Sequence, residues 1–170
     1  AIHMAEELGL IEQFDLAVLE KAIQMMRRPG NGLIKVAVNV SAASLSNLTQ
    51  GLEFSGVLSG TGFNKIGAGT LVLSGTNTYT GATTVSAGIL NLRNATGLGT
   101  AAGGTTVSNG ATLQLQDGIT VGAEALSLNG GAASGQTGAL VNVSGTNTYG
   151  GAITVTSSSS ISAASGSVLN

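Results

Sequence analysis

The sequence predicts a mainly β protein: a right-handed parallel β-helix, or β-solenoid, preceded by an N-terminal helix–strand segment. Three observations lead to this prediction. Short alternating apolar runs, separated by Gly, Ser, Thr and Asn, fill the chain from about residue 51 onward. Two short sequences recur within that part of the chain. The composition changes near residue 48, which predicts two segments, 1–48 and 49–170.

The change in composition is clearest in the charged residues and the glycines. The chain has 170 residues, with six Lys or Arg and eight Asp or Glu, and nine of these fourteen charges lie in positions 1–35. Of the 27 glycines, 24 lie in positions 51–170. The two segments therefore differ in physical type.

The totals exclude several classes of function. A net charge of −2 without a basic cluster leaves no electrostatic footprint for nucleic acid. No apolar run approaches the roughly 18–20 residues of a membrane-spanning helix. Without Cys there is no disulfide framework, thiol nucleophile or thiolate zinc site. Because the chain lacks a start Met and a signal-peptide pattern, we expect it to be an internal piece of a longer protein.

Residues 10–28 are predicted to form one amphipathic helix, because apolar residues recur at steps of three and four. Residues 29–32, Pro-Gly-Asn-Gly, would end it. The alternating, β-branched run 33–40 then predicts a strand. We expect the helix to lie against the first coil as a cap, since solenoids need their ends covered.

This first segment carries a family resemblance. Residues 5–23, AEELGLIEQFDLAVLEKAI, and residues 36–47, VAVNVSAASLSN, resemble the part of an EAL domain that follows its EAL signature. That family consists of cyclic di-GMP phosphodiesterases built on a TIM-type barrel. Asn39 matches a metal-ligand position of the family, but the Glu-Ala-Leu signature, the later acidic ligands and the catalytic Lys have no counterpart. The resemblance thus implies a truncated, inactive EAL fragment without a metal site.

Nine short strands are predicted in the second segment, each bounded by turn-forming residues. They span residues 70–74, 83–86, 89–92, 105–108, 112–115, 119–121, 125–128, 139–143 and 153–156. Within them, aliphatic residues two positions apart are candidates for the core: Leu71 and Leu73, Leu90 and Leu92, Leu113 and Leu115, Leu126 and Leu128, Val141 and Val143, Ile153 and Val155.

Internal repetition favours a solenoid over a sandwich or a barrel. SGTNTY occurs at 74–79 and again at 144–149, and TTVSAG at 83–88 is echoed by TTVSNG at 105–110. The offsets of 70 and 22 both fit one repeat of about 22–23 residues. One such repeat suits one coil of a parallel β-helix, which predicts five or six coils. Stacked coils favour Ser, Thr and Asn outside, because ladders of like charge would repel.

A second, more specific resemblance covers residues 52–92, LEFSGVLSGTGFNKIGAGTLVLSGTNTYTGATTVSAGILNL. This run resembles the passenger-associated repeat of bacterial autotransporters, and SGTNTYGGAITV at 144–155 resembles a second, degenerate copy. The resemblance rests on Gly60, Gly62, Lys65, Gly67, Gly69, Leu71, Leu73, Gly75, Asn77, Tyr79, Gly81, Thr84, Val85, Gly88 and Leu90. It implies a bacterial cell-surface or secreted protein whose β-helical passenger is exported through a C-terminal barrel. That translocator barrel is therefore an expected partner in the full protein.

The charged residues and tyrosines of the second segment are the candidates for a catalytic role. A glycan-cleaving β-helix needs several acidic groups on one face, but the solenoid segment offers only scattered charges: Glu53, Lys65, Arg93, Asp117 and Glu124. Asp117 and Glu124 would share one coil, although Gly118 and Gly122 indicate ordinary turns there. Tyr79 and Tyr149 occupy matching repeat positions, which favours a shared structural role. We expect no catalytic, cofactor-binding or metal site, and no cofactor.

The sequence therefore predicts a structural or adhesin-like passenger segment of an exported surface protein, with an unknown cell-surface or matrix partner. The alternative is a truncated, inactive EAL-type phosphodiesterase fragment. The two readings imply opposite compartments, because cyclic di-GMP is a cytoplasmic nucleotide and passengers are exported. This conflict motivates a further hypothesis, that the junction between the segments is a chimera.

Overall fold

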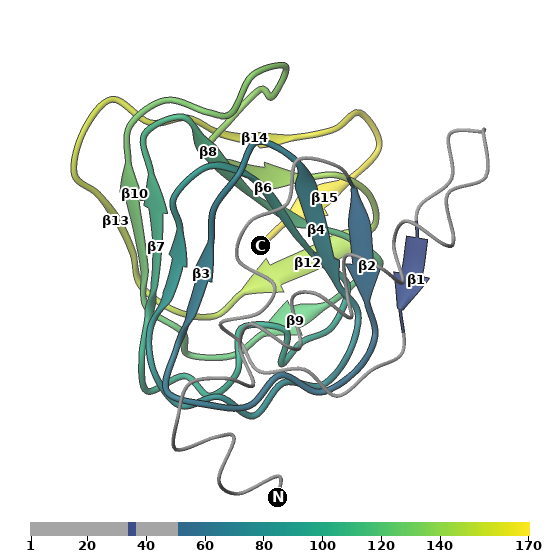
Figure 1. The fold of residues 1–170 in the computed structure, drawn as a ribbon. Coiled ribbons are helices and arrows are strands. Elements are labelled where there is room, and N and C mark those ends of the chain that lie inside the picture. Colours follow the sequence, from purple (N-terminus) through teal and green to yellow (C-terminus); the bar gives the residue numbers. More distant parts are fainter. Residues whose placement is uncertain (1–33, 37–50) are drawn as a thin grey trace, which may run out of the picture.

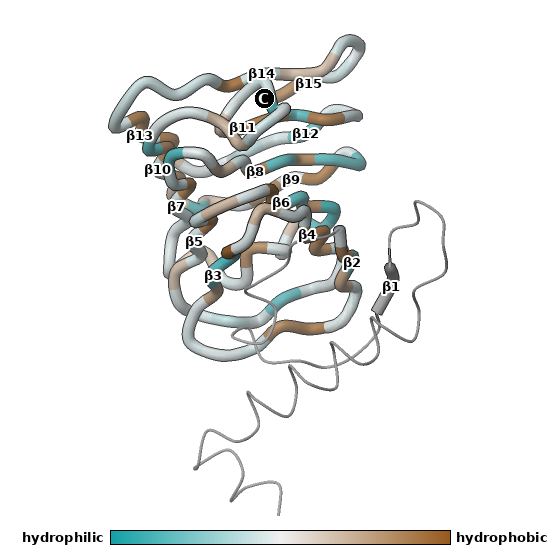
Figure 2. Tube along the Cα trace, turned by 45° about the horizontal axis from the view of Figure 1, so that its top comes forward, coloured by the Kyte–Doolittle hydropathy of each residue, from teal (hydrophilic) through white to brown (hydrophobic). Residues whose placement is uncertain are grey.

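In the computed structural model, which describes residues 34–36 and 51–170, the chain forms a parallel β-solenoid of about five turns. Figure 1 looks along the solenoid, and Figure 2 shows its turns stacked in layers. Every strand pair in the described residues is parallel. The predicted mainly β fold class, a parallel β-solenoid, is confirmed. In this part of the chain, no helix is long and apolar enough to cross a membrane.

Three parallel sheets form the walls of the solenoid (Figure 1). The seven-stranded sheet contains β1 (Ile34–Val36), β2 (Leu52–Phe54), β4 (Thr70–Leu73), β6 (Gly88–Leu92), β8 (Ala111–Leu115), β11 (Leu140–Asn142) and β14 (Ile161–Ala163), in that order. The five-stranded sheet contains β3 (Phe63–Lys65), β5 (Thr83–Val85), β7 (Thr105–Ser108), β10 (Leu126–Asn129) and β13 (Ile153–Val155). The three-stranded sheet contains β9 (Thr120–Val121), β12 (Thr146–Tyr149) and β15 (Val168–Leu169).

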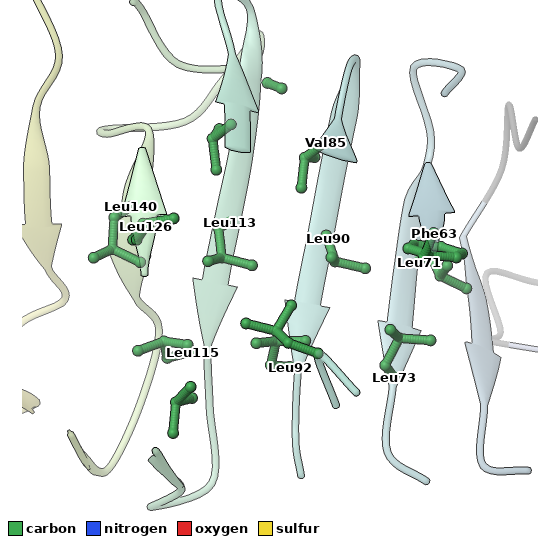
Figure 3. Close-up of a cluster of buried hydrophobic side chains, with 14 of the residues drawn as sticks. Phe63, Leu71, Leu73, Val85, Leu90, Leu92, Leu113, Leu115, Leu126 and Leu140 are labelled. Atoms are coloured by element: carbon green, nitrogen blue, oxygen red, sulfur yellow. The ribbon is translucent and has the colours of Figure 1, made fainter. Parts of the chain in front are cut away.

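The core is built from rows of leucines that stack from turn to turn. Leu71, Leu90, Leu113 and Leu140 are in register on β4, β6, β8 and β11, and none of them is exposed to solvent (Figure 3). A second row runs through Leu73, Leu92 and Leu115. Full burial of each such side chain stabilises the fold by about 1.5–3 kcal/mol. These rows confirm the inward positions predicted for β4, β6 and β8.

All nine predicted strands are present, with ends that differ by at most one residue. The described residues contain five further strands of the second segment that were not predicted: β2, β3, β12, β14 and β15. Each has two to four residues, too few for alternation to stand out. In addition, β3 and β12 place Lys65 and Asn147 in buried positions, which hides the apolar pattern.

The prediction that Val141 and Val143 face the core is wrong. On β11, Leu140 is in register with Leu113, and Asn142 is in register with Leu115. The side chains of Leu140 and Asn142 are therefore the inward ones, because a shift of one residue exchanges the two faces of a strand. The run Ala-Leu-Val-Asn-Val supports either register on hydrophobicity alone.

Ile153 and Val155 have the predicted register but not the predicted burial. They are aligned with Leu126 and Leu128 of the preceding turn, yet 37% and 52% of their surface is exposed. Both lie in the last turns of the solenoid, where no further turn of the described residues stacks on them (Figure 2). Alternation predicts the face of a strand, whereas burial also requires a neighbouring turn.

The turns vary in length around the predicted 22–23 residues. Register partners are 19 residues apart between β2 and β4 and 28 residues apart between β9 and β12. One long turn contains the loop 130–138, which folds over β8: the Thr112 hydroxyl donates to the Gly138 carbonyl at 2.9 Å and accepts from the Ala133 amide at 3.1 Å. The sequence repeat is therefore an average over turns that differ in their loops.

The strand predicted over residues 33–40 is present as β1. It pairs in parallel with β2, so that Ile34 aligns with Leu52 and Val36 aligns with Phe54. This strand therefore extends the seven-stranded sheet of the solenoid. The predicted helix 10–28, its capping role and Asn39 lie outside the described residues.

Candidate functional site

Three of the five charged residues of the solenoid segment meet on the outer face of the seven-stranded sheet. Arg93 lies between two carboxylates, with its Nη1 4.0 Å from Glu53 Oε2 and its Nε 3.7 Å from Asp117 Oδ2. The Ser74 hydroxyl also donates to Glu53 Oε1 at 3.0 Å. These residues are far apart in sequence, and stacking of the turns brings them together.

A row of side-chain amides lies on the same face. Asn91 Nδ2 donates to Gln114 Oε1 at 2.9 Å and to Gln116 Oε1 at 3.2 Å. Gln114 Nε2 in turn donates to Gln136 Oε1 at 2.7 Å. We call this surface the polar face: Glu53, Asn91, Arg93, Gln114, Gln116, Asp117 and Gln136.

The chemistry of the polar face is that of hydrogen bonding across turns. Hydrolysis of a glycoside needs two carboxyl groups on either side of the bond, one of which holds a proton as general acid. Here Glu53 and Asp117 instead form ion pairs with the one Arg93 side chain that lies between them. The arrangement suits contacts between turns and with a polar surface better than acid–base catalysis.

Asp117 and Glu124 share one turn, but the structure gives them different surroundings. The Asp117 side chain is 51% exposed and adopts a positive φ of 72° in the turn after β8. Glu124 is 3% exposed, and its Oε1 accepts a hydrogen bond from the Thr105 hydroxyl at 3.0 Å. Burial raises the pKa of Glu124 above its ordinary value. The two carboxyl groups therefore do not form a common site.

Lys65 is a buried cation that the sequence did not distinguish from a surface charge. It has no exposed surface, and its Nζ donates to the carbonyls of Ile66, Gly67 and Ala87 at 2.9, 2.7 and 3.1 Å. Burial lowers the pKa of Lys65 to about 8. The one signal in the sequence is its position two residues after Phe63, in the alternation of a strand.

The two copies of SGTNTY place their asparagines in the same role. Asn77 Oδ1 accepts the Leu58 amide at 2.9 Å, and Asn147 Oδ1 accepts the Ile119 amide at 2.7 Å. In both copies the next residue, a Thr, donates its own amide to the carbonyl of that same Leu or Ile. Each asparagine thus joins its turn to the preceding turn.

The tyrosines of the two copies are also buried. Tyr79 has no exposed surface and Tyr149 is 6% exposed. The Tyr79 hydroxyl lies 2.7 Å from Thr83 Oγ1, and its ring centroid is 6.1 Å from that of Phe63. Both tyrosines therefore lie in the core, where burial raises their pKa values.

Within residues 34–36 and 51–170, no group of three or more His, Cys, Asp or Glu is placed to hold a metal ion. The metal-ligand match of Asn39 falls outside these residues and stays a prediction.

Comparison with known families gives one match. The family model of the passenger-associated-transport repeat matches residues 63–92, which comprise β3 to β6. The match lies inside the range where the sequence resembles that repeat, and the resemblance is confirmed there. No curated protein and no solved structure matches the chain. The resemblance of residues 1–48 to an EAL domain stays a prediction.

Proposed function

We propose that this chain is a structural, passenger-like segment of an exported bacterial surface protein of the autotransporter type. The observation that carries the proposal is a passenger-associated-transport repeat within a parallel β-solenoid. In such a segment the turns serve as a rigid spacer. The full protein would then contain a translocator barrel, through which the segment reaches the cell surface.

The arrangement of polar groups supports a structural role. The polar face makes side-chain hydrogen bonds and ion pairs between turns, and the asparagines of the SGTNTY copies and Lys65 make hydrogen bonds to neighbouring turns. A rod exposed to the environment benefits from such bonds, since each adds roughly 0.5–1.5 kcal/mol when both partners are satisfied. An adhesive role of the polar face is the finer part of the proposal.

Export tests the proposal directly. The 170-residue chain would be placed behind a signal peptide and in front of an autotransporter barrel. An antibody against the segment would report its display on intact cells, and external protease would report whether it is folded. We expect the segment to appear at the surface in a folded, protease-resistant form. Retention inside the cell would contradict the proposal.

Two deletions of one turn each make this test specific. Removal of 63–82 joins residues in equivalent register, because Phe63 pairs with Thr83, and it removes most of the matched repeat. Removal of 105–125 is the matched control, because Thr105 pairs with Leu126 outside the repeat. We expect the first deletion to lower display several-fold and the second to leave it near the level of the full chain. Equal effects would argue against a role of the matched repeat in export.

Adhesion and catalysis need separate measurements. Cells that display the segment should bind immobilised mucin or fibronectin more than cells that display the barrel alone; equal binding would leave the spacer role and remove the adhesive one.

The purified chain should not hydrolyse cyclic di-GMP in the presence of Mg²⁺ or Mn²⁺. Turnover would contradict the structural assignment and favour the EAL alternative.

A further inference from the structure

The five-stranded sheet carries two polar side chains where its neighbours are apolar. One inward row of this sheet aligns Phe63, Thr83, Thr105 and Leu126 from turn to turn. Thr83 and Thr105 are 0% and 2% exposed, so both hydroxyls lie inside the solenoid. Each hydroxyl has a side-chain partner: that of Thr83 lies beside the Tyr79 hydroxyl, and that of Thr105 donates to Glu124.

Glu124 is thereby a buried carboxyl with which no Lys or Arg of residues 51–170 forms an ion pair. In residues 51–170, the ion pairs of Arg93 join Glu53 and Asp117, and the Lys65 ammonium faces three carbonyls. The recorded partner of Glu124 is the neutral hydroxyl of Thr105. Because taking an unpaired carboxylate out of water costs free energy, this burial favours the neutral carboxylic acid more than the Thr105 hydrogen bond favours the carboxylate.

The next turn of the solenoid, which contains Tyr149 and Gly151, packs against the backbone of Glu124. A Cβ atom at Gly151 would overlap the carbonyl oxygen of Glu124, so the two backbones pass in direct contact. Tyr149, two residues earlier on β12, is buried, and its hydroxyl has no hydrogen-bond partner among the described residues. Burial raises the pKa of Tyr149. Glu124 therefore lies between the turn of Thr105 and the turn of Tyr149.

We propose that Glu124 is a proton-dependent latch in the core: as a neutral acid it lets the turns that contain Thr105 and Tyr149 close, and as a carboxylate it loosens them. Among the titratable groups of residues 51–170, Tyr79 and Tyr149 interact with Glu124, and burial keeps both neutral throughout the acidic and neutral range. The latch does not depend on the proposed export of the segment.

The sign of the effect follows from proton linkage. An unfolded Glu has a pKa of about 4.3, whereas burial raises that of Glu124 in the folded chain. Between these two values the folded chain holds one more proton than the unfolded chain, so stability falls as pH rises. The unfolding equilibrium constant therefore rises by up to about tenfold per pH unit within that window.

The two tyrosines provide a direct reporter. The chain has two Tyr and no Trp, and both tyrosines lie beside this buried network. We expect the tyrosine emission of the native protein, followed from about pH 4 to about pH 8, to change with a midpoint above the ordinary Glu pKa of about 4.3. The transition should disappear in Glu124→Gln and persist in Asp117→Asn. Asp117 is a suitable control, because it is an exposed carboxylate of the same turn and Asn tolerates its positive φ.

Urea unfolding across the same range supplies the second readout. The free energy of unfolding of the wild type should fall as Glu124 loses its proton. That of Glu124→Gln should lack this fall, so it should exceed the wild-type value at the alkaline end. An unchanged transition in Glu124→Gln, in either emission or stability, would overturn the proposal. If Glu124→Gln fails to fold, the chemical shift of the Glu124 carboxyl carbon in the wild type decides. A midpoint at or below the ordinary Glu value would then reject the latch.

Discussion

At the scale of single residues, Lys65 shows how the fold accommodates a charge that ought to avoid the core. Its ammonium group occupies an inward position of β3, aligned with Val85 of the next turn, and three carbonyls replace its water. Burial of a lysine costs free energy unless all of its donors are bonded. Because the ammonium carries three donors and meets three acceptors, the interaction is complete.

Replacement of Lys65 by Met keeps the volume and removes the donors. We expect Lys65→Met to lower the free energy of unfolding by about 2–3 kcal/mol at neutral pH, since three partly buried carbonyls lose their partner. Urea denaturation followed by circular dichroism measures this loss. Arg93→Gln, which removes a partly exposed cation, should cost less than about 1 kcal/mol. Similar losses of unfolding free energy in both variants would show that removal of the positive charge, and not loss of the hydrogen bonds to the carbonyls, destabilises Lys65→Met.

Lys65 also predicts a dependence on alkaline pH. Its pKa is lowered to about 8 by burial, whereas an unfolded Lys titrates near about 10.4. Between these values the unfolded chain holds the extra proton, so stability should rise as pH increases from about 8 toward about 10. The rise should be absent in Lys65→Met, as measured by urea unfolding at several pH values. A wild-type stability that falls throughout this range would contradict the assignment.

At the scale of the coil, small residues at the corners set the spacing between turns. A Cβ atom at Gly81 would overlap the carbonyl oxygen of Thr61, and Gly151, its counterpart in the second copy of the repeat, has the same relation to Glu124. Gly81→Ala should therefore force the turns apart and cost about 3 kcal/mol or more.

Gly122 provides the matched control for this prediction. It lies at another turn, has no positive φ, and a Cβ atom there would meet nothing within 4 Å. Gly122→Ala should change stability by less than about 1 kcal/mol, toward stabilisation. Thermal unfolding of the two variants checks the difference. A loss in Gly122→Ala as large as that in Gly81→Ala would show that loss of glycine flexibility, and not overlap, is responsible.

The asparagine of the SGTNTY repeat joins three consecutive turns. Asn77 accepts the Leu58 amide at 2.9 Å and donates to the Gly97 carbonyl at 2.7 Å, both in buried surroundings. Asn77→Ala leaves both backbone groups without partners and should cost about 2–4 kcal/mol in urea unfolding. Asn64, whose Oδ1 accepts an exposed bond from Ser86, is the control, and Asn64→Ala should cost less than about 1 kcal/mol. Equal costs would mean that water replaces the bonds of Asn77.

The same residues mark the limit of prediction from sequence. Alternation identified the leucine rows of β6 and β8, because Asn91 and Gln114 separate their leucines, and the row extends to Leu71 and Leu73 of β4. It failed for Val141, where both registers of the strand look apolar, and register depends on the turn that precedes it. It also gave no hint that Glu53, Arg93 and Asp117 meet, since their contact depends on how many residues each turn contains. The repeat pointed to Asn77 and Tyr79 as special positions, but not to their partners.

At the scale of the whole molecule, each turn contacts only the turns before and after it. The strands of the seven-stranded sheet pair in chain order, from β1 and β2 to β11 and β14. Stability in such a one-dimensional stack is a sum of turn and interface contributions, so it need not be uniform along the rod. The inner turns have two interfaces, whereas the last described turn has one.

Hydrogen exchange should therefore vary along the solenoid of the 170-residue chain. The amides of β6 and β8 lie between turns whose leucines have no exposed surface, and we expect them to exchange slowest. Those of β15 should exchange fastest among the described strands, because Val168 is 48% exposed and β15 pairs only with β12.

Leu113→Ala removes a central side chain and should cost about 2–5 kcal/mol. If the turns open separately, it should accelerate exchange in β8 and its neighbours more than in β2. Uniform protection in the wild type, or uniform acceleration in Leu113→Ala, would show instead that the stack opens as a single cooperative unit.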